Sequence, residues 1–334
     1  MNYKFSFIIP VFNRREEIEE LLDSFSNVKK INTAEIIIVE DGSDETCKAI
    51  CNKYAERLNI SYYYKSNSGP GDSRNYGMRH ARGDFFIILD SDVLMPKDYL
   101  VNLAENLATN AVDCFGGPDA AHKDFSNVQK AINYTMTSFF TTGGLRGNHN
   151  SQTYEPRSFN MGLSQKAFEL SGGFSDIHPG EDPDLSIRLK KSGFAIAYFE
   201  DCYVYHKRRI DFRKFAKQVY KFGLVRPILN SWHPESRRLT YWFPLFFSLG
   251  FLFSLSLNFK GIFALLYFFI LYFILIMLDS TFKNKSLKIG IYSVFSTLIQ
   301  FFSYGYGFMI SSFNIFILKK DPRTVFPFLF FRHT

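Results

Sequence analysis

The sequence predicts an α/β fold, a mostly parallel sheet with helices on both faces, followed by a membrane domain. Three observations support this prediction. Short apolar segments alternate with amphipathic helical segments near the N-terminus, acidic residues follow the apolar segments, and Phe, Leu, Ile and Tyr dominate the chain after residue 238. Alternating β and α segments form parallel sheets covered by helices, whereas long uncharged runs are typical of membrane helices.

Four strands and three helices are expected before residue 92. The strands are short apolar segments, and the helices carry apolar residues three and four positions apart. The expected strands are residues 4–11, 35–39, 60–65 and 84–89, and the expected helices lie at 18–25, 47–54 and 72–81. Ligands of such sheets bind beyond the carboxyl ends of the strands. The polar residues at those ends are Asn13, Glu40, Asp41, Asp90 and Asp92.

Composition excludes several classes of protein. The chain has 334 residues, of which 46% are apolar and 21% are charged, and its formal net charge is +7. These values exclude a disordered or collagen-like chain. No cysteine pair has metal-binding spacing, so we expect buried thiols and a reducing compartment. The cysteines are Cys47, Cys51, Cys114 and Cys202. No signal peptide is seen before the first strand, which favours a cytosolic N-terminal domain.

Asp90 and Asp92 form the first candidate site, because one residue separates them at the end of a very apolar strand. Carboxylates bind hard cations such as Mg²⁺ and Mn²⁺, and a diphosphate can supply the remaining ligands. A cation there would neutralise the charge that develops on a phosphate leaving group. The alternative is that both aspartates only form a turn.

Glu181, Asp182 and Asp184 form the second candidate site. Asp182 is expected to cap a helix that has Pro183 in its first turn. Capping does not explain the neighbouring carboxylates, whose repulsion raises the pKa of at least one. A carboxylate with a raised pKa can take a proton from an acceptor hydroxyl.

A further strand, residues 202–206, ends in His206. A single histidine is often structural or lies at the surface. Together with Asp90 and Asp92, however, it is a candidate third ligand of the cation.

The ordered set of motifs resembles the family 2 glycosyltransferases, inverting enzymes with the GT-A fold, of the membrane-bound bacterial type. The resemblance covers about residues 4–225. Its motifs are Phe7–Asn13 (FIIPVFN), Glu40–Ser43 (EDGS), Gly71–Asn75 (GDSRN), Leu89–Asp92 (LDSD), Gly172–Phe174 (GGF), Gly180–Asp182 (GED) and Tyr205–His206.

The resemblance implies a role for individual residues. Asp182 matches the family's catalytic base. Asp90 and Asp92 match its D-x-D motif, which holds a divalent cation (Mg²⁺ or Mn²⁺) and the donor diphosphate, and His206 matches a metal-contacting histidine of part of the family. The residues expected to bind the nucleotide sugar are Pro10, Val11, Asn13, Glu40, Asp41, Arg74, Asp90, Ser91 and Glu181.

Two departures from the family pattern matter. Glu40–Asp41 stands where the family has two aspartates, which leaves open which carboxylate contacts the base of the nucleotide. The Q-x-x-R-W motif of processive synthases is also absent, and the nearest segment, 217–220, does not match it. The sequence therefore favours a single addition over polymerisation.

The C-terminal part predicts membrane attachment. Phe212, Phe215, Val219 and Phe222 lie at helical spacing among basic residues, a pattern typical of a helix at a membrane surface. Three uncharged runs follow, at residues 239–259, 261–278 and 289–318. Each is long enough to approach or span a bilayer, and we expect two to three membrane segments.

The expected domains are therefore a GT-A catalytic domain at 1–205, a basic interfacial region at 206–238 and a membrane domain at 239–334. The sequence predicts a multi-pass protein of the cell (inner) membrane whose catalytic domain faces the cytosol, as the Lys-rich loop after residue 278 favours.

The function expected is an inverting glycosyltransferase of cell-envelope, capsule or surface polysaccharide biosynthesis. It would move one sugar from a UDP- or GDP-sugar to a hydroxyl of a membrane-associated lipid or lipid-linked glycan. Nucleic acid is not an expected partner. Two alternatives stay open: sugar transfer to polyprenyl phosphate, and a non-catalytic nucleotide-binding membrane scaffold.

Overall fold

The computed structural model describes residues 3–120, 125–143, 154–206 and 211–331, which form two compact units. The sheet unit comprises Met1–His122, His149–Lys207 and Phe330–Thr334, and the helical unit comprises Lys123–Asn148 and Arg208–Leu329. This division differs from the three consecutive domains that the sequence predicted. Residues 123–148 join the helical unit, and the chain re-enters the sheet unit at Phe330.

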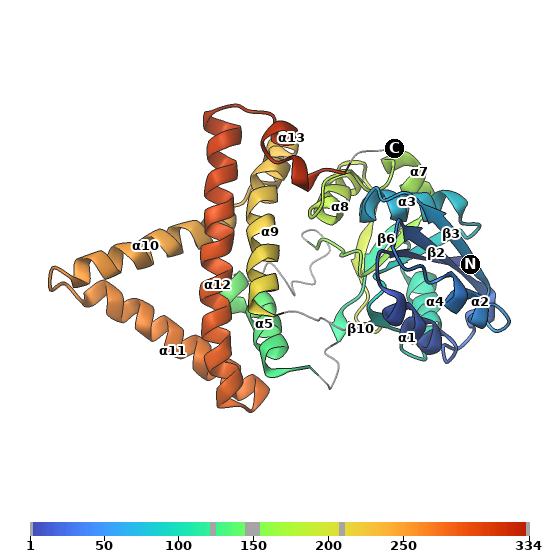
Figure 1. The fold of residues 1–334 in the computed structure, drawn as a ribbon, viewed down its shortest axis with the longest axis horizontal. Coiled ribbons are helices and arrows are strands. Elements are labelled where there is room, and N and C mark those ends of the chain that lie inside the picture. The colour runs from blue at the N-terminus through green and yellow to red at the C-terminus, as the bar shows by residue number, and fades with distance from the viewer. Residues whose placement is uncertain (1–2, 121–124, 144–153, 207–210, 332–334) are drawn as a thin grey trace. The chain divides into compact units, whose positions relative to one another are not determined.

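The sheet unit contains the mostly parallel sheet that the sequence predicted (Figure 1). Its strand order is β3-β2-β1-β4-β8-β6-β9, and only β8 runs antiparallel to its neighbours. The strands are β1 (Phe5–Val11), β2 (Ala34–Asp41), β3 (Ile60–Lys65), β4 (Phe85–Leu89), β6 (Cys114–Gly116), β8 (Asn160–Ser164) and β9 (Ile196–Tyr198). A smaller sheet pairs β5 (Val93–Leu94), β10 (Val204–His206) and β7 (Asp119–Ala120).

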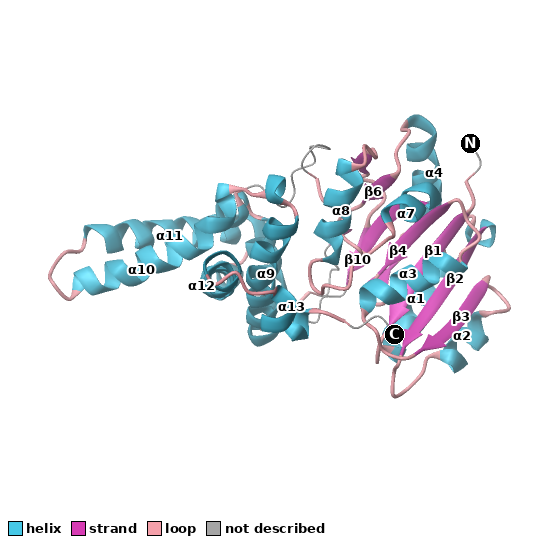
Figure 2. Cartoon of the chain, turned by 90° about the horizontal axis from the view of Figure 1, so that it is seen from above, coloured by secondary structure: helices cyan, strands magenta, loops and turns pink. Residues whose placement is uncertain are grey.

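Helices cover both faces of the large sheet (Figure 2). Side chains alternate along a strand, so Phe7 and Ile9 pack on one face and Ile8 packs on the other. The first face is covered by α1 (Arg15–Phe25), α2 (Lys48–Tyr54) and α4 (Tyr99–Thr109). The second is covered by α3 (Pro70–His80), α7 (Gln165–Ser171) and α8 (Glu181–Lys191). All four cysteines are buried and free, as expected.

The helical unit is built around two long helices, α9 (Phe212–Trp232) and α12 (Leu287–Ser312), which lie side by side (Figures 1 and 2). Glycines permit their close approach. A Cβ atom on Gly223 would lie 2.2 Å from the carbonyl oxygen of Tyr304, and one on Gly307 would lie 2.4 Å from that of Tyr220. The remaining helices are α5 (Asn127–Thr137), α6 (Phe139–Thr142), α10 (Phe243–Asn258), α11 (Ala264–Asn284) and α13 (Pro322–Val325).

The apolar stripe of α9 is used inside the helical unit, which corrects the expectation that it faces a membrane surface. Phe215 and Val219 are buried against Ile132 and Met136 of α5. Phe212 and Phe222 are partly buried against the same cluster. The spacing therefore predicted the helix correctly, but the partner of its apolar face is protein.

Two helices of the described chain are long and apolar enough to cross a membrane, Leu239–Asn258 and Ala264–Asn284. Most of their side chains are not buried in the protein, and Phe253 and Phe268, for example, are 58% and 67% exposed. The third uncharged run forms most of α12, which instead buries Ser293, Ser296 and Thr297 among its neighbours. Of the predicted two to three segments, two have the character of membrane spans.

Candidate functional site

Arg74 connects the two acidic motifs of the sheet unit. It lies on α3 and is only 4% exposed. Its Nη2 donates to Oδ1 of Asp90 at 2.9 Å, and its Nη1 donates to Oε1 of Glu181 at 3.0 Å. Burial opposes the charge of Arg74, but Asp90 and Glu181 raise its pKa, so the guanidinium stays charged. The guanidinium of Arg74 thus joins the end of β4 to the start of α8.

Glu181 has a second partner in His178, which the sequence did not single out. Nδ1 of His178 lies 2.8 Å from Oε1 of Glu181. Burial opposes ionisation of Glu181, yet His178 and Arg74 hold its pKa down at about 2. The pKa of His178 is raised, because the attraction of Glu181 outweighs burial. Glu181 is therefore a permanent anion within this site.

Asp182 has the opposite electrostatic character. Burial, followed by the charge of Glu181, raises its pKa to about 6. Its Oδ2 accepts from the backbone N–H of Ser158 at 3.2 Å, whereas Oδ1 is buried and has no hydrogen-bond partner among the described residues. A buried polar atom without a partner is uncommon. A hydroxyl group of a bound molecule that donates a hydrogen bond to Oδ1 would satisfy this atom.

The predicted cap of α8 is corrected by the structure. The helix begins at Glu181, and the N-cap residue is Gly180, whose φ of 124° suits glycine. Asp182 lies inside the first turn, with its side chain free of any capping role. The carboxylate that the sequence grouped with it, Asp184, forms an ion pair with Arg188 instead.

Arg188 and Asn75 fix the turn that precedes α8. Arg188 donates to the carbonyl oxygens of Ser171 and Gly173, both at 2.6 Å. The side-chain amide of Asn75 donates to the carbonyl oxygen of Phe174 and accepts from its N–H, both at 2.8 Å. Since Asn75 follows Arg74 on α3, these contacts hold α3 against the segment that leads to Glu181.

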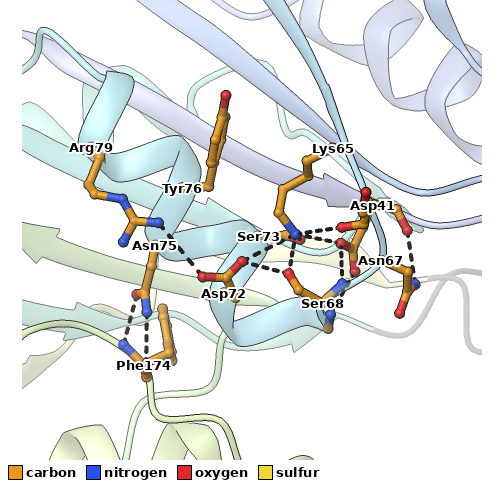
Figure 3. A network of polar contacts seen from close by, with 12 residues as sticks. Asp41, Lys65, Asn67, Ser68, Asp72, Ser73, Asn75, Tyr76, Arg79 and Phe174 are labelled. Carbon is orange, nitrogen blue, oxygen red and sulfur yellow. Dashed lines mark hydrogen bonds and ion pairs between the residues drawn. The ribbon is translucent and has the colours of Figure 1, made fainter. Parts of the chain in front are cut away.

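A polar network around Asp41 and Lys65 holds the loop between β3 and α3 (Figure 3). Oδ1 of Asp41 accepts from Nζ of Lys65 at 2.8 Å, and Lys65 also pairs with Asp72 at 3.2 Å. The N–H groups of Ser68 and Gly69 donate to the carboxylate of Asp41, both at 2.9 Å. Asp41 therefore shapes the loop from which α3, and with it Arg74, begins.

Glu40 and Asn13 join the ends of β1 and β2. Glu40 is fully buried and accepts from Ser43, from the N–H of Cys47 at 2.8 Å and from the hydroxyl of Tyr62 at 3.2 Å. The N–H of Asn13 donates to Oγ of Ser43 at 2.8 Å. Of the other residues predicted to bind the donor, Pro10 and Val11 end β1 beside Val39 and Glu40, and Ser91 lies between the two aspartates.

The backbone brings the three predicted cation ligands into one neighbourhood. His206 pairs with Val93, which directly follows Asp92. The side chain of His206 lies outside the described residues, and among described side chains no group of three His, Cys, Asp or Glu residues is arranged to hold a metal. Asp90 is held by Arg74 yet remains partly exposed. The carboxylate oxygens of Asp90 and Asp92 are donors that hard cations prefer, and a diphosphate would supply further ligands.

A separate cavity of about 530 Å³ lies on the sheet unit, lined in part by Leu94, Asp98, Asn102, Tyr203 and Tyr205. It contains none of the residues that the sequence assigned to the site. This cavity is therefore separate from the candidate site around Arg74.

Comparison with known proteins identifies the domain. Residues 6–170 match the family model described as "Glycosyl transferase family 2". The minor teichoic acid biosynthesis protein GgaB of Bacillus subtilis is 33% identical over 105 residues, 30% of this chain and 12% of that protein. The poly(ribitol-phosphate) beta-N-acetylglucosaminyltransferase TarS of Staphylococcus aureus is 35% identical over 104 residues, 30% of this chain and 18% of that protein.

The matched stretch thus spans less than a fifth of either relative. Among solved structures, the mannosyltransferase PcManGT from Pyrobaculum calidifontis, in complex with GDP-Man and Mn²⁺, has a TM-score of 0.53 and 18% sequence identity. The match covers 67% of this chain and 63% of that one. At this identity the similarity concerns the fold, which is the GT-A fold that the sequence predicted.

Proposed function

The chain carries a family 2 glycosyltransferase domain, and from this premise we propose that it transfers a single sugar from a nucleotide-sugar donor to a hydroxyl group of a membrane-associated lipid or lipid-linked glycan. One observation carries the proposal. A buried, unpartnered carboxylate oxygen with a raised pKa, on Asp182, lies next to an anion of low pKa and a charged arginine. This is the environment of a general base beside a site for a phosphate group.

In the proposed reaction, the acceptor hydroxyl attacks the anomeric carbon of the donor sugar. Asp182 takes the hydroxyl proton at Oδ1. The bond between the anomeric carbon and the phosphate oxygen breaks, and its electron pair leaves with the nucleoside diphosphate. Attack opposite the leaving group inverts the anomeric carbon, as the family resemblance implies.

Arg74 binds the leaving phosphate in this proposal. Its Nε is buried and has no hydrogen-bond partner among the described residues, while its two other nitrogens are held by Asp90 and Glu181. The two carboxylates fix the orientation of the guanidinium, and a local opening of the site would let the buried Nε reach a phosphate oxygen. Asp41 contributes by holding the loop before α3.

Asp90, Asp92 and His206 would hold a divalent cation, Mg²⁺ or Mn²⁺, which supplies Lewis-acid stabilisation of the leaving diphosphate when bound. The GT-A neighbour PcManGT was solved with Mn²⁺. Removal of the cation with EDTA is expected to abolish sugar transfer, and Mn²⁺ or Mg²⁺ to restore it. Asp92→Ala is expected to remove the cation-dependent part of nucleotide binding, measured by calorimetry. Transfer that is unaffected by EDTA would contradict this assignment.

We further propose that the acceptor lies at the cell membrane, with the catalytic domain on the cytosolic side. The helices Leu239–Asn258 and Ala264–Asn284 support a membrane hairpin whose two ends carry basic residues. Arg237 and Arg238 precede the hairpin, Lys283 lies in its last turn, and Lys285 and Lys288 follow it. Because basic residues next to membrane segments favour the cytosolic side, both ends of the hairpin are expected to face the cytosol. The names of two relatives, one for teichoic acid biosynthesis and one for poly(ribitol-phosphate) glycosylation, support a role in cell-envelope polysaccharide synthesis.

The decisive experiment uses the purified full chain with a panel of UDP- and GDP-sugars, Mn²⁺ and a membrane lipid extract. We expect one donor to yield a glycosylated product. Asp182→Asn is expected to retain nucleotide binding but to lose transfer by about 10²-fold or more. Asp201→Asn, which changes an exposed carboxylate outside the site, is the matched control.

The same variant separates the alternatives. A phosphate acceptor is already ionised and needs no base, so full transfer by Asp182→Asn would favour polyprenyl phosphate as the acceptor. Binding of a nucleotide sugar by the unaltered protein with neither transfer nor slow hydrolysis would favour a non-catalytic scaffold.

A further inference from the structure

Phe330 and Phe331 belong to the sheet unit although they follow the helical unit in the sequence. Phe330 forms an isolated antiparallel bridge with Ile177, and the N–H of Phe331 donates to the carbonyl oxygen of Asp176 at 3.0 Å. The end of the chain therefore pairs by its backbone with the segment that leads into α8. Backbone pairing of this kind fixes register as well as position.

The ring of Phe331 lies on the loop that leads into α3. A Cβ atom on Gly69 would lie 2.3 to 2.7 Å from three carbons of that ring, so no larger residue fits beneath it. Gly69 has a φ of +91°, and its N–H is held by Asp41. On the other side, the centroid of the Phe331 ring lies 6.1 Å from that of His178, the partner of Glu181.

Phe331 thus contacts two separate segments of the candidate site. One segment ends at Gly69 and continues into α3, which carries Arg74. The other contains His178 and continues into α8, which carries Glu181. The Arg74–Glu181 ion pair needs both helices in place. An aromatic ring placed over both segments restricts the movement of each.

We propose that Phe331 is a positioning residue that holds the loops before α3 and α8 together and so pre-organises the nucleotide site. The inference rests on the proposed function, because it assigns that role to a residue outside every motif of the family. Without the ring, a smaller fraction of the molecules has both loops in the arrangement that binds nucleotide. The apparent affinity for nucleotide falls in proportion to that fraction. The chemical step, which depends on Asp182, is not directly affected.

The test is made on the full chain with UDP and GDP as binding probes in the presence of Mn²⁺. Phe331→Ala is expected to weaken binding of the preferred nucleotide about tenfold and to raise KM for its sugar, with kcat changed less than twofold. Phe331→Tyr keeps the ring and is expected to restore both values. Phe328→Ala removes an exposed ring three residues earlier and is the matched control.

Three results would overturn the proposal. Equal binding by Phe331→Ala and the unaltered protein would show that the ring positions nothing. Tighter binding by Phe331→Ala would show that the ring obstructs the site rather than organising it. An equal fall in kcat and in affinity that Phe331→Tyr does not restore would likewise indicate only general destabilisation and overturn it.

Hydrogen exchange separates this proposal from the proposed function. Phe331→Ala is expected to accelerate amide exchange at residues 66–70 and 176–181, with little change elsewhere. If the unaltered protein binds neither nucleotide, the proposed function fails, and the exchange result alone decides whether Phe331 holds the loops. Unchanged exchange in both segments would overturn the positioning role even if the chain proves to be a glycosyltransferase.

Discussion

Asp182 shows how one side chain can be prepared for proton transfer by its neighbours. Burial and the charge of Glu181 raise its pKa to about 6, while His178 and Arg74 keep Glu181 ionised. Two adjacent carboxylates on one helix turn therefore have pKa values that differ by several units. Separation of this kind is how proteins assign different roles to residues of the same type.

The pH dependence of transfer should report this pKa. A base must be ionised to accept a proton, so kcat/KM is expected to fall about tenfold per pH unit below pH 6 and to be constant just above it. The measurement is kcat/KM from pH 4.5 to 8 with the preferred donor. A profile that stays flat down to pH 4.5 would show that a group of lower pKa, and not Asp182, limits the reaction.

Asp182 should also make stability depend on pH. The unfolded chain releases its proton near the ordinary value of 3.8, whereas the folded chain keeps it up to about pH 6. Folding stability therefore decreases as pH rises from 3.8 to 6, and the loss persists above that window. Asp182→Asn is expected to be more stable than the unaltered protein at pH 7.5, by about 3 kcal/mol. Denaturant unfolding at pH 4 and pH 7.5 tests this, since the difference should nearly vanish at pH 4.

Part of this site could be predicted from the sequence. Asp90 lies directly after a strand, where the rule for parallel sheets expects a ligand site. Its link through Arg74 to Glu181 is visible only in the folded chain. His178 and Lys65 carry no such local pattern. Their roles depend on which distant side chains reach them, and only the folded chain shows that.

At the level of elements, close packing of α9 on α12 depends on glycine. Gly307→Ala is expected to destabilise the helical unit by about 1 to 3 kcal/mol, because the added methyl group meets the carbonyl oxygen of Tyr220. Gly250→Ala, in α10, has only an ordinary contact at 3.5 Å and is expected to be neutral or slightly stabilising, since alanine favours helix. Thermal unfolding in detergent compares the two. Equal destabilisation would contradict the packing argument.

Periodicity predicted the strands and helices of the sheet unit because each has one clear face. It did not reveal α5, although Ser126 and Gln129 form a capping box there, a pattern that the sequence alone contains. For α9, periodicity identified the helix but could not identify what covers it. An apolar stripe can pack against lipid or against protein, and here it packs against α5 and α12, which are distant from α9 in the sequence.

For the whole molecule, the division into two units could not be deduced from the order of the sequence. Residues 123–148 leave the sheet unit and return, and Phe330 re-enters it after the helical unit is complete. Composition identifies the apolar C-terminal part of the chain, but it does not indicate which other segments belong to the helical unit. The family match at residues 6–170 includes residues 123–148 of the helical unit but leaves Arg208–Leu329 without a counterpart.

The path of the third uncharged run is the remaining prediction at this scale. Because α12 buries serine and threonine side chains within the helical unit and is not among the candidate spans, we expect the chain to cross the membrane twice. Lys288 and Lys320 should then lie on one side of the membrane and Lys260, between α10 and α11, on the other.

Single cysteines at these three exposed positions test the arrangement, since the four native thiols are buried and supply little background. In inverted membrane vesicles, an impermeant maleimide is expected to label Lys288→Cys and Lys320→Cys but not Lys260→Cys, and intact spheroplasts should give the opposite pattern. Labelling of Lys320→Cys together with Lys260→Cys would mean that α12 crosses the bilayer. The basic residues after α12 would then face away from the cytosol, against the rule that basic residues flanking membrane segments stay on the cytosolic side.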